Sequence, residues 1–253
     1  MARLPAPNPW MSNRQRLDEL LVARGFYPSR SRARDAILRG TVSVGGVTAS
    51  KPAQPIPADA VVAIADEGRR YVSRAAMKLK HALAHFGLSA KGRHALDIGA
   101  STGGFTQVLL EQGAAHVTAI DVGHGQMRVG DPRVTLIEGL NARDLARQHL
   151  AFPVDLIVCD VSFISLKLAL PPAMALAEPG AQLVALIKPQ FEVGRDKLGR
   201  GGVVAGPQEH RRVCREISEF MAELGWTVLG ITPSPIEGGD GNREFLMALS
   251  ARE

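Results

Sequence analysis

The sequence predicts an α/β protein with a doubly wound, mainly parallel, seven-stranded sheet that follows a small helix–helix–hairpin module. Two observations predict this class. From residue 73 onward, short apolar runs alternate with helical stretches, as in parallel sheets that carry helices on both faces. The chain has 253 residues, of which 45% are hydrophobic. This length suffices for one sizeable α/β domain and a small accessory module.

Composition excludes several classes of protein. No stretch of 18 or more apolar residues is free of charge or proline, so we expect no membrane-spanning segment. Residues 1–13 contain three prolines and no apolar signal region, which predicts a disordered lead-in rather than a secretory signal. Cys159 and Cys214 form no cluster with histidine, which argues for a cytoplasmic protein and against a zinc site.

The excess of basic charge lies in the first quarter of the chain. Residues 1–70 carry 11 Lys and Arg against 6 Asp and Glu, whereas residues 71–253 carry 19 of each. A basic block beside a neutral body indicates a module that binds a polyanion. A solvated basic face without a ligand is the alternative.

Residues 14–65 are expected to form this basic module. Leucines at helical spacing predict a first helix that ends before Gly25. Ser29 is expected to cap a second helix. Two strands, Val42–Val44 and Val47–Ala49, follow and are joined by Gly45-Gly46, a suitable two-residue hairpin turn.

The same residues resemble the S4 RNA-binding domain. RLDELL, GFYPSRSRARDAI, GTVSVGG and KP occur in the order and spacing of that domain. Gly45 stands where many members have asparagine, and both residues suit the turn. The resemblance implies RNA binding, and arginines four apart share one face of the second helix. The residues expected to bind RNA are Arg16, Arg30, Arg32, Arg34, Arg39 and Lys51. Residues 66–72 are expected to form a short charged linker.

Residues 73–253 are expected to form the α/β domain. The strand-like segments are Ala95–Ile98, Val117–Ile120, Val134–Ile137, Leu156–Cys159, Leu183–Ile187, Thr227–Ile231 and Phe245–Leu249. Helical stretches such as Phe105–Glu111 and His210–Leu224 lie between most of them. Ligands of such sheets bind at the carboxyl ends of the strands.

A glycine-rich turn follows the first of these strands. In ALDIGASTGGF, Asp97 and Gly99 precede a glycine pair that opens a helix. Such a turn alone can be a plain tight turn, but Asp121 ends the next strand, where nucleoside-binding folds hold ribose hydroxyls. The Gly-Lys-Ser/Thr ending of phosphate loops is absent, which disfavours ATP and GTP, and the dinucleotide GxGxxG is absent too.

This pattern resembles motif I of S-adenosylmethionine-dependent methyltransferases. The resemblance implies S-adenosylmethionine as the cofactor, with Asn141 contributing from beyond the third strand on the adenine side. The other residues implied to bind the cofactor are Asp97, Gly99, Ala100, Ser101, Thr102, Gly103, Gly104, Phe105 and Asp121.

Four charged residues are expected at the same rim of the sheet. Asp160 and Lys188 end the fourth and fifth strands, Glu244 precedes the last strand, and Lys78 lies on the helix that enters the domain. Each alone can be a solvated charge or part of an ion pair. Together they resemble the Lys-Asp-Lys-Glu tetrad of the FtsJ-type ribose 2′-O-methyltransferases. This implies a Rossmann-like methyltransferase fold whose last strand is antiparallel.

The resemblance narrows to one branch and covers nearly the whole chain beyond residue 14. SRAAMKL, DIGASTGGFT, IDVGHGQM, CDVSFISL, KPQFE and GNREFL resemble the TlyA/haemolysin A-like family of rRNA methyltransferases. The family implies methylation of a cytidine ribose, with ribosomal RNA and ribosomal subunits as partners. Arg70-Tyr71-Val72 has tyrosine where members often have tryptophan, so the influence of the linker on cofactor affinity stays open.

The chemistry leaves two roles open for Lys188. A ribose hydroxyl is a poor nucleophile at neutral pH, so methyl transfer requires in-line approach and a group that orients or removes the hydroxyl proton. Lys188, with Lys78 close by, can position the hydroxyl or, as a neutral amine, deprotonate it. No metal is required. Arg195, Lys197 and Arg200 lie among glycines and predict a mobile basic loop on the substrate side.

Other functions stay possible at this level. One is an RNA-binding protein with a vestigial methyltransferase fold. Another is a membrane-lytic haemolysin, which would need a secretion signal, a spanning segment or a strongly amphipathic basic helix. The S4-like module disfavours a small-molecule or protein substrate. The sequence leaves open the modified nucleotide, the ribosomal subunit and the oligomeric state.

Overall fold

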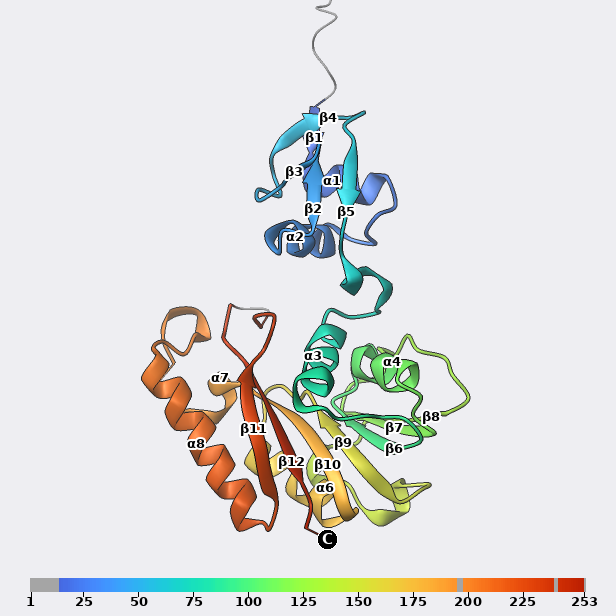
Figure 1. Ribbon diagram of the computed structural model, residues 1–253, viewed down its shortest axis with the longest axis vertical. Coiled ribbons are helices and arrows are strands. Elements are labelled where there is room, and N and C mark those ends of the chain that lie inside the picture. The colour runs from blue at the N-terminus through green and yellow to red at the C-terminus, as the bar shows by residue number, and fades with distance from the viewer. Residues whose placement is uncertain (1–13, 195–197, 239–240, 253) are drawn as a thin grey trace, which may run out of the picture. The chain divides into compact units, whose positions relative to one another are not determined.

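The computed structural model describes residues 14–194, 198–238 and 241–252. The chain forms two compact units that divide between Arg70 and Tyr71 (Figure 1). Each unit has its own hydrophobic core. Across the described ranges, no helix combines the length and the apolar character that a membrane crossing requires.

The first unit is built from short elements around the buried leucines of its first helix. β2 is the central strand of the antiparallel sheet β3-β2-β5, and β1 pairs with β4. In chain order, its described elements are β1 (Arg14–Arg16), α1 (Leu17–Ala23), α2 (Arg30–Leu38), β2 (Val42–Val44), β3 (Val47–Thr48), β4 (Pro55–Pro57), β5 (Val62–Ile64) and the 3₁₀ helix η1 (Glu67–Arg70).

The predicted end of α1, the cap of α2 and the hairpin turn are confirmed, whereas β3 ends at Thr48, one residue earlier than expected. Helix α1 ends in a Schellman arrangement, in which Gly25, at φ 71°, donates to Val22 and Phe26 donates to Leu21. Ser29 accepts from the backbone N–H of Arg32 and so caps α2. The hairpin turn has positive φ at both glycines, as a type I′ turn requires. The pair β1–β4 was not predicted, because β4 contains two prolines and such segments read as loops.

The second unit confirms the predicted fold class. Its seven described strands form one sheet in the order β11-β12-β10-β9-β6-β7-β8. Pairing is parallel except where β12 runs antiparallel to β10 and β11. The strands are β6 (His94–Ile98), β7 (His116–Asp121), β8 (Val134–Glu138), β9 (Val154–Cys159), β10 (Ala177–Ile187), β11 (Thr227–Pro233) and β12 (Phe245–Ser250).

Helices cover both faces of this sheet (Figure 1). The helices are α3 (Ala76–Phe86), α4 (Gly104–Glu111), α5 (Leu166–Ala169), α6 (Pro171–Ala175), α7 (Pro189–Glu192) and α8 (Pro207–Glu223), with the 3₁₀ turns η2 (Ala142–Asp144), η3 (Arg147–His149) and η5 (Arg200–Gly202). Side chains alternate along each strand. Leu156 and Val158 of β9 pack with α3 and α4, whereas Ile157 and Cys159 pack with α5, α6 and α8. Both faces are therefore buried, as in a doubly wound sheet.

Several element boundaries differ from those expected by one or more residues, and the largest differences are at the starts of α8 and β10. Helix α8 begins at Pro207, three residues before the expected start, because proline suits the first helical position. Strand β10 begins at Ala177, and its register with β9 shifts before Gln182. Neither difference moves the carboxyl ends of β9 and β10, where the charged residues lie.

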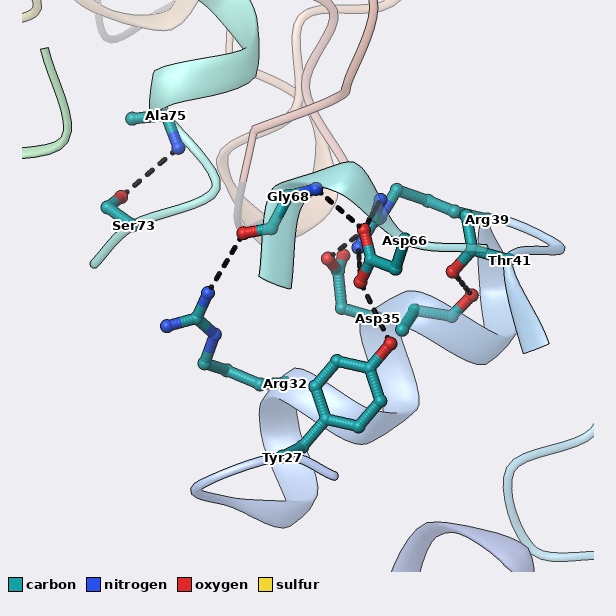
Figure 2. Close-up of polar contacts among 10 residues, drawn as sticks. Tyr27, Arg32, Asp35, Arg39, Thr41, Asp66, Gly68, Ser73 and Ala75 are labelled. Carbon is teal, nitrogen blue, oxygen red and sulfur yellow. Dashed lines mark hydrogen bonds and ion pairs between the residues drawn. The ribbon is translucent and has the colours of Figure 1, made fainter. Parts of the chain in front are cut away.

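The predicted linker divides between the two units. Asp66 belongs to the first unit, where Arg39 and Tyr27 donate hydrogen bonds to its carboxylate (Figure 2). Tyr71 belongs to the second unit, where it is buried and donates to Glu111 at 2.7 Å.

Candidate active site

The tetrad residues lie at the ends of three neighbouring strands and on one helix. Asp160 follows β9, Lys188 follows β10, and Glu244 immediately precedes β12. The strand order β12-β10-β9 places these ends side by side, and the pairing of Ile187 with Phe245 brings Lys188 level with Glu244. Lys78 comes from α3.

These four residues form two ion pairs. Lys78 pairs with Glu244, and the side chains are 8% and 3% exposed. The Nζ atom of Lys188 lies 2.7 Å from Oδ1 of Asp160, and the side chains are 10% and 13% exposed. The second contact is an ion pair without the alignment of a hydrogen bond. Buried lysines are rare without a partner, so the carboxylates account for both ammonium groups in this rim.

Lys188 has a further partner that the sequence analysis missed. Its Nζ donates to Oγ of Ser162 at 2.9 Å. Ser162 is two residues beyond Asp160 and is exposed. The motif CDVSF contained this serine, but only side-chain geometry shows that it reaches a lysine 26 residues away. An ammonium has three N–H donors, and Ser162 accepts from one of them, whereas Asp160 holds the ammonium by charge.

The glycine-rich turn approaches the same rim closely. Gly99 has φ 81°, and a Cβ there would lie 2.7 Å from the backbone oxygen of Asp160. Gly103 has φ 92°, and a Cβ there would lie 2.6 Å from the sulfur of Met127. Side chains at either position would displace the loop, so the glycines are required by both conformation and space.

Asp121 is held by the backbone of this turn. Its Oδ2 accepts from the N–H of Ser101 and its Oδ1 from the N–H of Gly123, both at 2.7 Å. The hydroxyl of Ser101 lies 3.0 Å from Oε1 of Gln126, which ties the turn to the segment after β7. Each carboxylate oxygen keeps a further lone pair, so Asp121 can still accept from ribose hydroxyls.

Asp97 is fully buried at the end of β6. Its Oδ2 accepts from the hydroxyl of Thr106 at 2.6 Å, whereas its Oδ1 has no hydrogen-bond partner among the described residues. Burial raises the pKa of Asp97 to about 7; the Thr106 bond opposes this shift, and the charge of Asp160 adds to it. A buried carboxyl oxygen without a partner at this rim is free to accept from a ligand.

The remaining predicted cofactor residues lie around this turn in different settings. Ala100 and Phe105 are buried, and Phe105 packs in the core on the α3–α4 face of the sheet. Thr102 accepts from the N–H of Arg128 through its backbone oxygen. Gly104 opens α4, and a Cβ there would lie 2.9 Å from Cβ of Ser73. Asn141 follows β8, and its side chain caps η2 by accepting from the N–H of Arg143 at 3.1 Å.

An aromatic side chain at the rim was also missed. Phe163 is 91% exposed, and its ring centroid lies 5.1 Å from that of Phe191. Within the described ranges, Phe163 and Ser101 are the two non-glycine residues with positive φ. Such strained backbone clusters at functional sites. An exposed aromatic ring of this kind can stack on a nucleobase.

Most arginines predicted to bind RNA form contacts within the first unit. Arg39 makes two hydrogen bonds to Asp66 at 3.0 and 3.1 Å, and Arg32 donates to the backbone oxygen of Gly68 (Figure 2). Burial alone would raise the pKa of Asp66, but hydrogen bonds from Arg39 and Tyr27 hold it below its ordinary value. These arginines therefore fix the segment that follows β5.

The arginines near α1 are paired in the same way. Arg16 donates twice to Asp18 at 2.9 Å, and Arg30 lies 3.4 Å from Asp18 and 3.2 Å from Glu19. Arg34 and Lys51 are exposed. Of the predicted basic loop, Arg195 and Lys197 lie outside the described residues, as does the side chain of Arg200.

Comparison with known proteins gives consistent matches over both units. Residues 71–251 match the family described as FtsJ-like methyltransferase, and residues 15–62 match the S4 domain. The 16S/23S rRNA (cytidine-2'-O)-methyltransferase TlyA of Mycobacterium tuberculosis is 45% identical over 94% of this chain and 91% of its own. Hemolysin A of Brachyspira hyodysenteriae is 38% identical over 91% of this chain and 98% of its own.

A solved structure agrees with these matches. A protein of Streptococcus thermophilus that is named as a hemolysin is 38% identical, with a TM-score of 0.74, over 96% of this chain and 90% of its own.

Proposed function

We propose a function from the premise that the chain belongs to the FtsJ-like methyltransferase family and carries an S4 domain before the methyltransferase unit. The protein transfers a methyl group from S-adenosylmethionine to the ribose 2′-hydroxyl of a cytidine in ribosomal RNA. The observation that carries this conclusion is that two largely buried ion pairs, Lys78–Glu244 and Lys188–Asp160, lie at the strand ends beside the glycine-rich turn.

The residues around the turn fit S-adenosylmethionine. Asp97 offers a buried carboxyl oxygen without a described partner, which suits a cationic group of the cofactor. Asp121 is held in place by two backbone donors and can accept from ribose hydroxyls. Gly99 and Gly103 let the turn pack closely, because a Cβ would collide with the backbone of Asp160 or the side chain of Met127. When bound, the cofactor supplies an electrophilic methyl group.

The chain's own residues then act on the hydroxyl of the substrate. Asp160 and Ser162 fix the position of the Lys188 ammonium. An N–H group that Ser162 does not use can then donate to the 2′-hydroxyl and hold it in line with the methyl group. In a neutral form, the same nitrogen can take the hydroxyl proton. Lys78 and Glu244 keep the neighbouring strand end in place and set the charge around Lys188.

We assign RNA recognition to the first unit, with residues 14–65 as the S4 module, 66–72 as the linker and 73–253 as the catalytic domain. The S4 match and the excess of basic residues before residue 71 support this assignment. Ribosomal RNA is the expected partner, as the name of the M. tuberculosis relative suggests. We place the protein in the cytoplasm, where it would meet that RNA free or within ribosomal subunits.

The cofactor assignment predicts a specific binding defect. We expect Asp121→Ala to weaken S-adenosylmethionine binding by about 10- to 100-fold, because the variant lacks the charged carboxylate that would accept hydrogen bonds from the ribose hydroxyls of the cofactor. Isothermal titration calorimetry measures the affinity. The control is Asp131→Ala, which removes a carboxylate that pairs with Arg133 before β8. Tight binding of NAD with no response to S-adenosylmethionine would sink the assignment.

The RNA assignment predicts different effects for Arg34, within α2, and for Arg39, directly after α2. We expect Arg34→Ala to weaken binding of the full-length protein to an rRNA fragment and to reduce the salt dependence of log K by about one unit, because an exposed arginine releases a counterion. We expect Arg39→Ala mainly to lower the melting temperature, because it leaves the buried Asp66 without its bidentate partner. An unchanged salt slope for Arg34→Ala would place the RNA surface elsewhere.

A further inference from the structure

Two segments of the rim lie against each other along their whole length. One is the rim loop, residues 160–165, and the other is Lys188 with the helix α7 that follows it. Lys188 contacts both Asp160 and Ser162, and the ring of Phe191 packs against that of Phe163. At the far end of the rim loop, Glu192 of α7 contacts Ser165 and the start of α5.

Glu192 anchors the end of the rim loop. Its Oε2 accepts from the hydroxyl of Ser165 at 2.5 Å, and its Oε1 accepts from the N–H of Leu166 at 2.8 Å. Ser165 in turn accepts from the N–H of Lys167, so the first N–H groups of α5 are satisfied. Burial raises the pKa of Glu192, although the bonds from Ser165 and Leu166 oppose that shift. Both oxygens of a partly buried carboxylate are thus used to hold one loop.

The rim loop needs such an anchor. Between the end of β9 and the start of α5 it contains no regular structure, and it includes the positive φ of Phe163. It carries both residues that direct Lys188, so a shift of the loop changes the aim of Lys188. Misplacement of a reacting group by about 1 Å can reduce catalysis by about 100-fold.

We propose that Glu192 is a positioning residue for Lys188, which acts by fixing the rim loop and, through it, Asp160 and Ser162. The proposal rests on the methyltransferase function proposed above. A simpler role, in which Glu192 only caps α5, makes different predictions for catalysis.

The first test compares Glu192→Ala with Glu192→Gln. Glu192→Ala is expected to lower kcat by about 10- to 100-fold and to leave the affinity for S-adenosylmethionine within about 2-fold. Glu192→Gln keeps an acceptor for the N–H of Leu166 and should recover part of the loss. The control is Glu219→Ala, which removes an exposed carboxylate on α8. A loss confined to melting temperature, with kcat unchanged, would overturn the proposal.

A double-mutant cycle separates positioning from capping. Glu192→Ala should reduce kcat much less in a Ser162→Ala background than in the native chain, because both changes release the same lysine. Independent, multiplicative losses would show that Glu192 does not act through the rim loop.

Amide hydrogen exchange gives a readout that does not depend on activity. Exchange in residues 160–166 should accelerate in Glu192→Ala and stay unchanged in Glu219→Ala. If the native protein methylates no rRNA while this exchange still responds, the proposed function fails and the anchoring of the rim loop stands. Unchanged exchange in Glu192→Ala refutes the anchoring itself.

Discussion

Lys188→Ala is expected to reduce methyl transfer by about 100- to 10,000-fold, which is the range for loss of one positioned proton-transfer group. Lys188 lies at the end of β10 between Asp160 and Ser162 and outside the glycine-rich turn. The protein should therefore still fold and keep nearly its native affinity for S-adenosylmethionine, although Asp160 loses its cationic partner and the melting temperature should fall. Transfer of a labelled methyl group to rRNA measures the first quantity, and calorimetry and thermal melting measure the others.

A plain solvated lysine would behave very differently in the same assay. Its loss would change stability by less than about 0.5 kcal/mol and leave turnover unaffected. Lys91→Ala provides this comparison, because Lys91 is exposed and precedes β6 at the opposite end of the sheet. Equal activity of the two alanine variants would remove Lys188 from the reaction.

Lys188→Arg distinguishes the two roles that the sequence left open. Arginine keeps the positive charge and can pair with Asp160, but it does not give up a proton at working pH. If Lys188 removes the proton of the 2′-hydroxyl, Lys188→Arg should be as inactive as Lys188→Ala. Near-normal turnover in the arginine variant would reject proton abstraction and leave Lys188 an electrostatic role.

Much of the fold was predictable because its signals are local. The strands are short apolar runs with glycine or proline near their ends, and the hairpin at Gly45-Gly46 follows from the need for positive φ. The pair β1–β4 was not predictable in this way, because Pro55 and Pro57 mask an edge strand that only its partner reveals.

For the candidate site, the sequence indicates which strand ends carry charged residues but not which side chains contact them. Lys188 and Asp160 are conspicuous because each charge directly follows an apolar strand. Ser162 and Glu192 are not, because their significance comes from hydrogen bonds to residues 26 and 27 positions away. Arg39 was predicted to bind RNA from its helix, but the structure pairs it with Asp66, 27 residues later. Side-chain contacts of this range have no local signature in the sequence.

Glu244→Ala is expected to lower the free energy of unfolding by about 3–5 kcal/mol, because it leaves the ammonium of Lys78 buried without its partner. The two side chains are 8% and 3% exposed, so water cannot replace the lost carboxylate without local opening. Glu219→Ala breaks the exposed pair with Arg215 and should change stability by less than about 1 kcal/mol. Urea denaturation of the three proteins measures the differences.

The double variant Lys78→Met, Glu244→Leu separates the stability of this pair from its part in the reaction. Apolar side chains of similar volume often replace a buried ion pair with no loss of stability, so the double variant should unfold near the native midpoint. It should nevertheless remain inactive in methyl transfer, because the charges beside Lys188 are gone. Recovery of both stability and activity would show that the Lys78–Glu244 pair serves only the fold. Loss of stability equal to that of Glu244→Ala would instead show that the rim does not tolerate apolar packing, and that the destabilisation does not arise from an unpaired charge.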